Sequence, residues 1–134
     1  MSLLLDDDYQ KLDELGVSYV EEDGQRFLVF KDYPLPDGLY QQSHCDVLVV
    51  IPANYNQAGN DMLWTHPRLI RADRKPIPKT NEYGGGDSRL FEGQEFCRWS
   101  RHWNSGSSRW RSGEDDITTI QRRIEWALRH PDAQ

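Results

Sequence analysis

Three side chains that can act as a nucleophile or a base lie close together in the sequence, at Cys97, Ser100 and His102. The cysteine is the best nucleophile of the three, and the positive charges of Arg98 and Arg101 predict a lowered pKa that favours its reactive thiolate. A serine hydroxyl is a weak nucleophile that needs an adjacent general base, and His102 can serve Ser100 in this way. The residues therefore allow either a thiol or a hydroxyl to carry covalent chemistry.

The same segment also suits a purely non-covalent binding role, because Trp99 and Trp103 alternate with Arg101 and His102. Arginines gather in this late part of the chain, at Arg98, Arg101, Arg109, Arg111, Arg122, Arg123 and Arg129. Arginine and tryptophan can stack on nucleic-acid bases, but protein interfaces are enriched in the same two residue types. Since the chain carries a net charge of -6 and nucleic-acid binding depends on neutralising phosphates, we predict a protein partner rather than a nucleic acid.

The remaining cysteine and histidine residues are predicted to have structural roles. Cys45 opens a strongly apolar run, and a buried cysteine behaves as a small hydrophobic residue; the same interpretation is open for Cys97, which lies beside Phe96. His66 precedes Pro67 and is expected to fix the geometry of its loop. Zinc-ligand residue types occur at these positions, but their spacing matches no metal-binding motif. We therefore predict neither a metal site nor a cofactor.

The length and composition predict one domain over residues 1–134. The hydrophobic content of 37% and the five tryptophans supply a core. No apolar stretch approaches the ~20 residues of a membrane span, and Met1–Leu5 is followed by three aspartates rather than by a signal-peptide core. Two cysteines are too few for a disulfide framework. We expect a cytoplasmic protein with reduced thiols and no membrane association.

These reactive residues must be positioned by an N-terminal helix and a set of strands. Apolar residues at positions 9, 12 and 15, followed by Gly16, predict a helix over residues 7–15. Strands are predicted for Val17–Val20 and Arg26–Phe30, because both runs are rich in β-branched and aromatic residues. Asp23-Gly24 between them favours a hairpin turn.

Two more strands and a break complete the first half. The prolines of Tyr33–Gly38 predict a turn, because proline removes a hydrogen-bond donor from a strand. Cys45–Ile51 is an almost unbroken apolar run that is typical of a buried strand. Met62–Trp64 predicts a short fourth strand. The four strands together are expected to form an antiparallel meander.

The second half is predicted to be irregular until a closing helix. Prolines and glycines interrupt every candidate element in Leu69–Gln94, so Arg71–Gly93 is predicted to be the most mobile part of the chain. A helix is predicted over Asp116–Arg129, because its apolar residues recur at helical spacing on one face. That face should be buried against the sheet through Ile117, Ile120 and Ile124.

This order of elements resembles the ubiquitin-conjugating (UBC) fold. Over residues 7–128 the chain is similar to a prokaryotic ubiquitin-conjugating-enzyme-like family. The genes of that family are found beside genes for bacterial ubiquitin-like proteins, activating enzymes and peptidases. The best local matches are Asp46–Ile51 leading to Tyr55, then Asp61–Trp64, and Trp99–His102. The resemblance implies an α+β fold with an N-terminal helix, a four-stranded antiparallel meander, a long irregular active-site region and a C-terminal helix.

The chain departs from the standard active-site motif of that fold. Standard members have a His-Pro-Asn triplet after the fourth strand, where this chain has His66-Pro67-Arg68. The missing asparagine is the important loss, because the resemblance implies an amide at this position that stabilises the oxyanion formed during transfer. Standard members also place their cysteine at a set distance before a tryptophan. The same distance before Trp110 falls on His102, and Cys97 lies five residues earlier.

The resemblance implies a role in ubiquitin-like conjugation, with antiviral defence as its expected setting. The chain would receive or position the C-terminus of a ubiquitin-like protein delivered by an activating enzyme. Whether it is an acyltransferase enzyme stays open, because a non-catalytic UBC-fold module that scaffolds either partner is the alternative. The catalytic candidates are His102, Ser100, Cys97 and His66, and the binding candidates are Trp99, Arg101, Trp103 and Tyr55.

Overall fold

Helix α1 (Asp6–Leu15) is bounded by the signals that predicted it. Three aspartates fill its first turn, where carboxylates stabilise the positive end of the helix dipole. Gly16 ends the helix with a φ of 67°, a left-handed conformation that glycine adopts without strain. The N-terminal helix predicted over 7–15 is therefore confirmed. The computed structural model describes residues 2–103 and 109–133.

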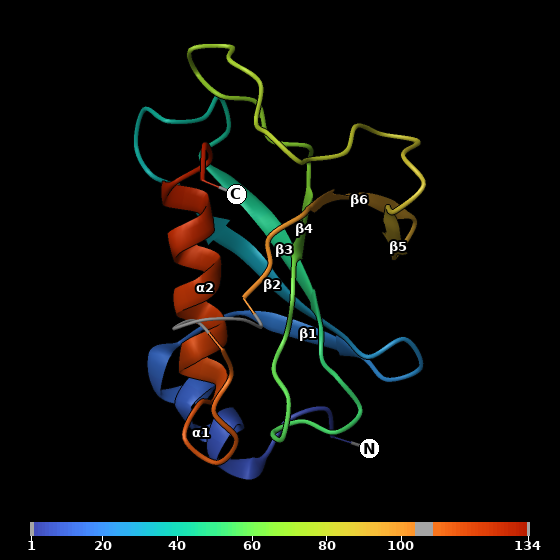
Figure 1. Cartoon of the computed structure of the whole chain (residues 1–134), viewed down its shortest axis with the longest axis vertical. Coiled ribbons are helices and arrows are strands. Elements are labelled where there is room, and N and C mark those ends of the chain that lie inside the picture. The colour runs from blue at the N-terminus through green and yellow to red at the C-terminus, as the bar shows by residue number, and fades with distance from the viewer. Residues whose placement is uncertain (1, 104–108, 134) are drawn as a thin grey trace.

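The strands of the described residues form one six-stranded sheet in the order β1-β2-β3-β4-β6-β5 (Figure 1). Their bounds are β1 (Tyr19–Glu22), β2 (Phe27–Pro34), β3 (His44–Val50), β4 (Leu63–His66), β5 (Arg89–Phe91) and β6 (Gln94–Trp99). Every pairing between neighbours is antiparallel. The first four strands pair in chain order, but the sheet continues, because β6 pairs with β4 and β5 pairs with β6.

The two extra strands correct the prediction of a wholly irregular stretch from Leu69 to Gln94. Glu92 and Gly93 join β5 to β6 with φ values of 50° and 75°, and two consecutive residues with positive φ are typical of a tight hairpin turn. The sequence concealed this turn because glutamate is not a usual residue at its first position. The prediction of irregular structure is therefore wrong for Arg89–Phe91, which forms β5.

The turn predicted from Tyr33 also needs correction, because β2 continues to Pro34. The pairing of β2 with β3 shifts register between Phe30 and Tyr33, and Asp32 has a φ of 52° at that irregularity. Pro34 is the last residue of the strand, a position where its missing N–H removes no interior hydrogen bond from the sheet.

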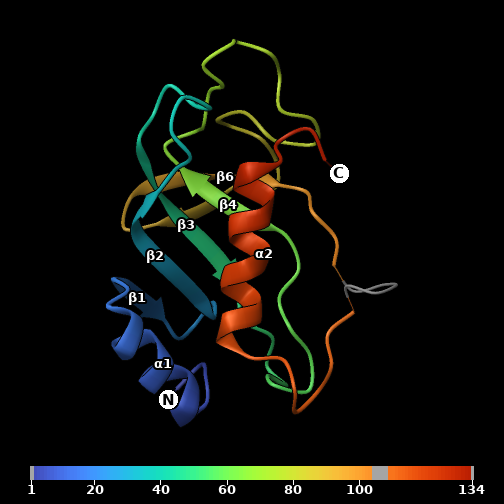
Figure 2. The same cartoon turned by 90° about the vertical axis from the view of Figure 1, so that its left-hand side faces the viewer.

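Helix α2 (Ile117–Arg129) lies across one face of the sheet (Figure 2). Its N-cap, Asp116, accepts a hydrogen bond from the N–H of Thr118 at 2.8 Å, which satisfies one of the free donors at the helix start. Ile117, Ile120 and Ile124 are completely buried in the core between helix and sheet. The closing helix and its apolar face are therefore confirmed. A second apolar cluster of buried residues contains Phe27, Val29, Leu48, Trp64 and Phe96.

Replacing Ile120 with alanine is expected to lower the free energy of unfolding by about 2–5 kcal/mol, because the side chain is fully buried and its removal leaves a cavity. Denaturant unfolding monitored by circular dichroism measures this change. Thr118→Ala on the exposed side of the same helix is the control and should change stability by no more than about 0.5 kcal/mol. Equal stabilities of the two variants would show that the Ile120 face does not hold the helix.

Candidate functional site

A serine, a histidine and an aspartate meet where β4 begins beside the end of β6. Leu63 at the start of β4 pairs with Trp99 at the end of β6, and the N–H of Met62 donates to the carbonyl of Arg101 at 2.8 Å. The pairing thus continues one step beyond the strands. Since the strands are antiparallel, Asp61, which lies two residues before β4, faces the residues just after β6.

The three side chains form a continuous hydrogen-bonded chain. Ser100 Oγ lies 3.1 Å from Nε2 of His102, and Nδ1 of His102 lies 2.9 Å from Oδ2 of Asp61. An ionised carboxylate accepts hydrogen bonds and cannot donate them, so Nδ1 carries a proton. In the neutral imidazole Nε2 is then the acceptor, and Ser100 donates its hydroxyl proton to it. This is the order of nucleophile, base and orienting carboxylate used in serine-dependent acyl transfer.

Asp61 is held in place by a second contact, because its Oδ1 accepts a hydrogen bond from the backbone N–H of Trp103 at 2.9 Å. Both carboxylate oxygens of Asp61 are therefore used by the segment that carries the histidine. The side chain of His102 is 65% exposed, whereas that of Asp61 is 29% exposed. The orienting group is thus partly shielded, while the base is open to a large substrate.

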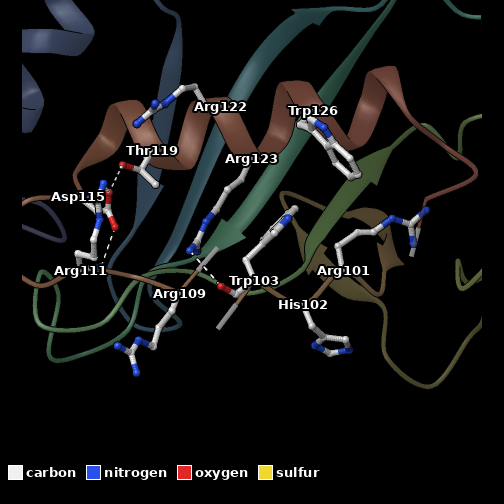
Figure 3. Close-up of a pocket in the computed structure, with 10 residues that line it drawn as sticks. All are labelled: Arg101, His102, Trp103, Arg109, Arg111, Asp115, Thr119, Arg122, Arg123 and Trp126. Atoms are coloured by element: carbon white, nitrogen blue, oxygen red, sulfur yellow. Dashed lines mark hydrogen bonds and ion pairs between the residues drawn. The ribbon is translucent and has the colours of Figure 1, made fainter. Parts of the chain in front are cut away.

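Arg123 of α2 holds the backbone next to Asp61 and the backbone next to His102. Its Nη1 donates to the carbonyl of Asn60 at 2.7 Å, and its Nη2 donates to the carbonyl of Trp103 at 3.4 Å (Figure 3). The guanidinium also lies 5.5 Å from the ring centre of Trp103 and 5.4 Å from that of Trp110, distances at which a cation and an aromatic ring attract. Burial lowers the pKa of Arg123.

A cleft of about 430 Å³ opens beside the histidine, between α2 and the chain on either side of residues 104–108 (Figure 3). His102 lines one part of it, and Arg109, Arg111 and Arg122 line others. Trp126 of α2 also borders the cleft and is 48% exposed. The cleft therefore places positive charge next to the hydrogen-bonded Ser100, His102 and Asp61.

The family model described as prokaryotic E2 family E matches residues 4–131. The chain belongs to this family. Neither the comparison with curated proteins nor the comparison with solved structures found a match. Membership associates the chain with ubiquitin conjugation, and in general terms with a ubiquitin-like protein and an activating enzyme. In the part of the chain that the structure describes, no helix is both long and apolar enough to span a membrane.

In this family member the cysteine candidate, Cys97, lies inside the sheet. It pairs with Thr65 in the middle of β6 and is 1% exposed. Burial raises the pKa of its thiol, and the negative charge of Glu95 adds to the increase. Arg98 instead forms an ion pair with Asp87 at 2.6 Å. The prediction of a lowered thiol pKa is therefore wrong, because removal from water outweighs the nearby positive charge.

Most of the predicted binding residues of the E2-family chain are also buried. Trp99, Arg101 and Trp103 are 1%, 2% and 8% exposed. Arg101 donates to the carbonyls of Pro78, Ser100 and Pro131, with its guanidinium over the ring of Trp99. Tyr55 is half-buried, and its ring centre lies 5.7 Å from that of Trp110. The two tryptophans thus pack mainly in the core, as their large apolar area favours, and the predicted binding roles of the four residues stay predictions.

His66 is placed apart from Ser100 and His102. Its Nδ1 lies 2.9 Å from the carbonyl oxygen of Glu95, to which it donates, and its ring centre lies 5.5 Å from that of Phe96. Phe96 precedes Ser100 by four residues, which is about 13 Å of extended strand. The structure therefore does not bring this catalytic candidate to the others. No three His, Cys, Asp or Glu side chains among residues 2–103 and 109–133 are grouped so that they could hold a metal ion.

Asp61 is the site residue that sequence reasoning missed as a catalytic group. It lay within the Asp61–Trp64 match, but nothing in the local pattern distinguishes it from an ordinary loop aspartate. Its position 41 residues before His102 in the chain hid the contact. Asp61 could have been found by predicting that the fourth strand pairs with the segment before Ser100. That prediction requires β6 to be recognised as a strand first.

Proposed function

We propose that Ser100 accepts the C-terminal acyl group of a ubiquitin-like protein as an ester, with His102 as general base and Asp61 as the group that orients it. The observation that carries this proposal is the continuous hydrogen-bonded chain from Ser100 Oγ through His102 to Asp61. Family membership supplies the general setting of ubiquitin-like conjugation. The finer assignment of a hydroxyl in place of the standard thiol rests on this chain's own geometry.

The first step is transfer from a thioester carried by the activating enzyme. Ser100 Oγ attacks the thioester carbonyl carbon while Nε2 of His102 takes the hydroxyl proton. The new C–O bond forms, the C–S bond breaks, and the departing thiolate takes the proton back from the imidazolium. Asp61 stabilises the transient positive charge on the imidazole and keeps Nδ1 protonated. No oxidant or reductant is needed.

The second step passes the acyl group to an amine. A neutral amine attacks the ester carbonyl, the C–O bond to Ser100 breaks, and the serine oxygen recovers a proton from His102. The amine's proton goes to His102 in exchange. Because His102 is largely exposed, a protein-borne amine can approach the ester from solvent. Ser100, His102 and Asp61 carry out the transfer, and other residues would have to select the acceptor amine.

The chemistry of the adduct tests the proposal. Purified chain, activating enzyme, ubiquitin-like protein and ATP should yield an adduct that survives reducing thiols, is released by hydroxide and is absent in Ser100→Ala. Ser100→Cys should give an adduct that reducing thiols cleave. Intact mass spectrometry before and after each treatment identifies the bond.

Cys97→Ala is the matched control, and its adduct should form normally if the protein remains folded by circular dichroism. A thiol-labile adduct in the unmodified chain that vanishes in Cys97→Ala would overturn the assignment to Ser100. If no adduct forms with any variant while the chain still binds the ubiquitin-like protein, the non-catalytic scaffold becomes the better description of this family member.

A further inference from the structure

We infer that the arginine-lined cleft beside His102 binds an acidic segment that precedes the C-terminal residue of the ubiquitin-like protein. This inference rests on the proposed function, because it names what lies next to the reacting carbonyl. Five arginines and one aspartate line the cleft, which is a formal excess of four positive charges. The whole chain has a net charge of -6, so the cleft differs in sign from the protein around it.

The exposed arginines of the cleft are available to a ligand. Arg109 and Arg122 are exposed and form no hydrogen bond or ion pair within the described residues. Arg111 reaches Glu114 and Asp115 at 3.5 Å each, which is a long separation for such contacts. Since guanidinium groups bind carboxylates through paired hydrogen bonds, these side chains can take up acidic residues without first losing a close partner.

The only carboxylate among the lining residues does not neutralise them. Asp115 is 6% exposed, and its oxygens accept hydrogen bonds from the backbone N–H of Arg111 at 2.6 Å and from the hydroxyl of Thr119 at 3.1 Å. Its charge is therefore committed to the start of α2. The positive charges of Arg109 and Arg122, which also line the cleft, have no carboxylate partner within the described residues.

The position of the cleft fixes which part of the ligand it meets. His102 lines the cleft and also contacts the oxygen of Ser100, so a chain ending at Ser100 continues past His102 into the cleft. The α2 residues that line it run from Thr119 to Trp126, a rise of about 10 Å along the helix. About three extended residues span that length. The acidic residues should therefore lie within roughly the last five positions of the ligand.

A protein segment fits this cleft better than a nucleic acid does. Binding of single strands uses exposed aromatic rings for stacking, but Trp99, Trp103 and Trp110 are at most 8% exposed. Trp126 is the exposed tryptophan of the cleft, and its ring already stacks on His130 at 4.5 Å between centres. The surface thus offers charge without a row of free rings.

Peptide binding to the intact chain tests the inference without any transfer reaction. The probe is a fluorescent decapeptide ending in glycine with three glutamates among its last five residues, measured by fluorescence anisotropy. A peptide with glutamine at those positions should bind at least about tenfold more weakly at low salt, since several charged contacts are lost. Moving the glutamates to the first five positions should weaken binding similarly. Added salt should weaken the acidic peptide most, because exposed charges are screened.

Variants of the protein then locate the site. Arg109→Gln with Arg122→Gln should weaken binding by about 5- to 25-fold, whereas Arg129→Gln, which removes one positive charge from α2 outside the cleft, should change it by less than about twofold. Ser100→Ala should bind the peptide normally while losing the ester, which separates this inference from the proposed function. Equal binding of acidic and neutral peptides, indifference to the paired substitution, or tighter binding of a single-stranded oligonucleotide would each overturn it.

Discussion

Replacing His102 with alanine is expected to slow ester formation at Ser100 by about 10²- to 10⁴-fold, the usual contribution of a positioned general base. The reason is geometric. Nε2 of His102 lies 3.1 Å from Ser100 Oγ, so it takes the hydroxyl proton as the carbonyl is attacked. Without it the hydroxyl must lose its proton to water. Single-turnover loading from the charged activating enzyme, followed by intact mass over time, measures the rate.

Asp61→Asn should reproduce a large part of that loss while leaving the fold intact. An asparagine at this position can present its N–H₂ group to Nδ1, which favours the imidazole form with the proton on Nε2. That form cannot accept a proton from Ser100. If His102→Ala and Asp61→Asn both load at the normal rate, the hydrogen-bonded chain has no catalytic role.

The chain contains a matched control for this experiment. Ser43 Oγ and Nδ1 of His44 also lie 3.0 Å apart, and both residues are exposed. No contact of His44 with a carboxylate occurs among the described residues. His44→Ala should therefore leave loading unchanged. Loss of activity in this variant would mean that the reaction responds to exposed histidines in general.

Local sequence patterns were sufficient to predict the two helices. Apolar spacing and end signals predicted α1 and α2 closely, because the apolar face and the end residues of a helix all lie within one short run of sequence. β5 and β6 were missed, because Arg89–Phe91 is short and its turn begins with an unusual residue, Glu92. Because β6 was missed, the burial of Cys97 inside a strand was missed as well.

Contacts between distant segments explain what the sequence could and could not predict about the site. Ser100 and His102 are two residues apart, so their pairing could be proposed from the sequence. Asp61 joins them through an antiparallel register that no local pattern records. The burial of Trp99 could not be predicted for a related reason: exposure of a large aromatic residue is decided by the packing of the whole core.

Replacing Arg123 with alanine is expected to lower the free energy of unfolding by about 3–5 kcal/mol. Each charge-assisted hydrogen bond lost from a buried site contributes about 1.5–3 kcal/mol, and the ring contacts add to this. The carbonyls of Asn60 and Trp103 lose a donor that lies at 2.7 Å and 3.4 Å respectively. Denaturant unfolding measures the loss. Arg122→Ala, the exposed neighbour on the same helix, should be nearly neutral.

A stability loss alone would not assign Arg123 to the site, so the Arg123→Lys variant carries the decisive measurement. Lysine keeps the positive charge, but its single ammonium group cannot reproduce the fork of a guanidinium that reaches both carbonyls. The protein should therefore stay folded while the segments bearing Asp61 and His102 lose their common support. Imidazole nitrogen spectra should then show a weakened hydrogen bond at Nδ1 of His102, and loading of Ser100 should slow in parallel. If Arg123→Lys retains both the Nδ1 signal and the loading rate, Arg123 supports the fold but does not position the catalytic histidine.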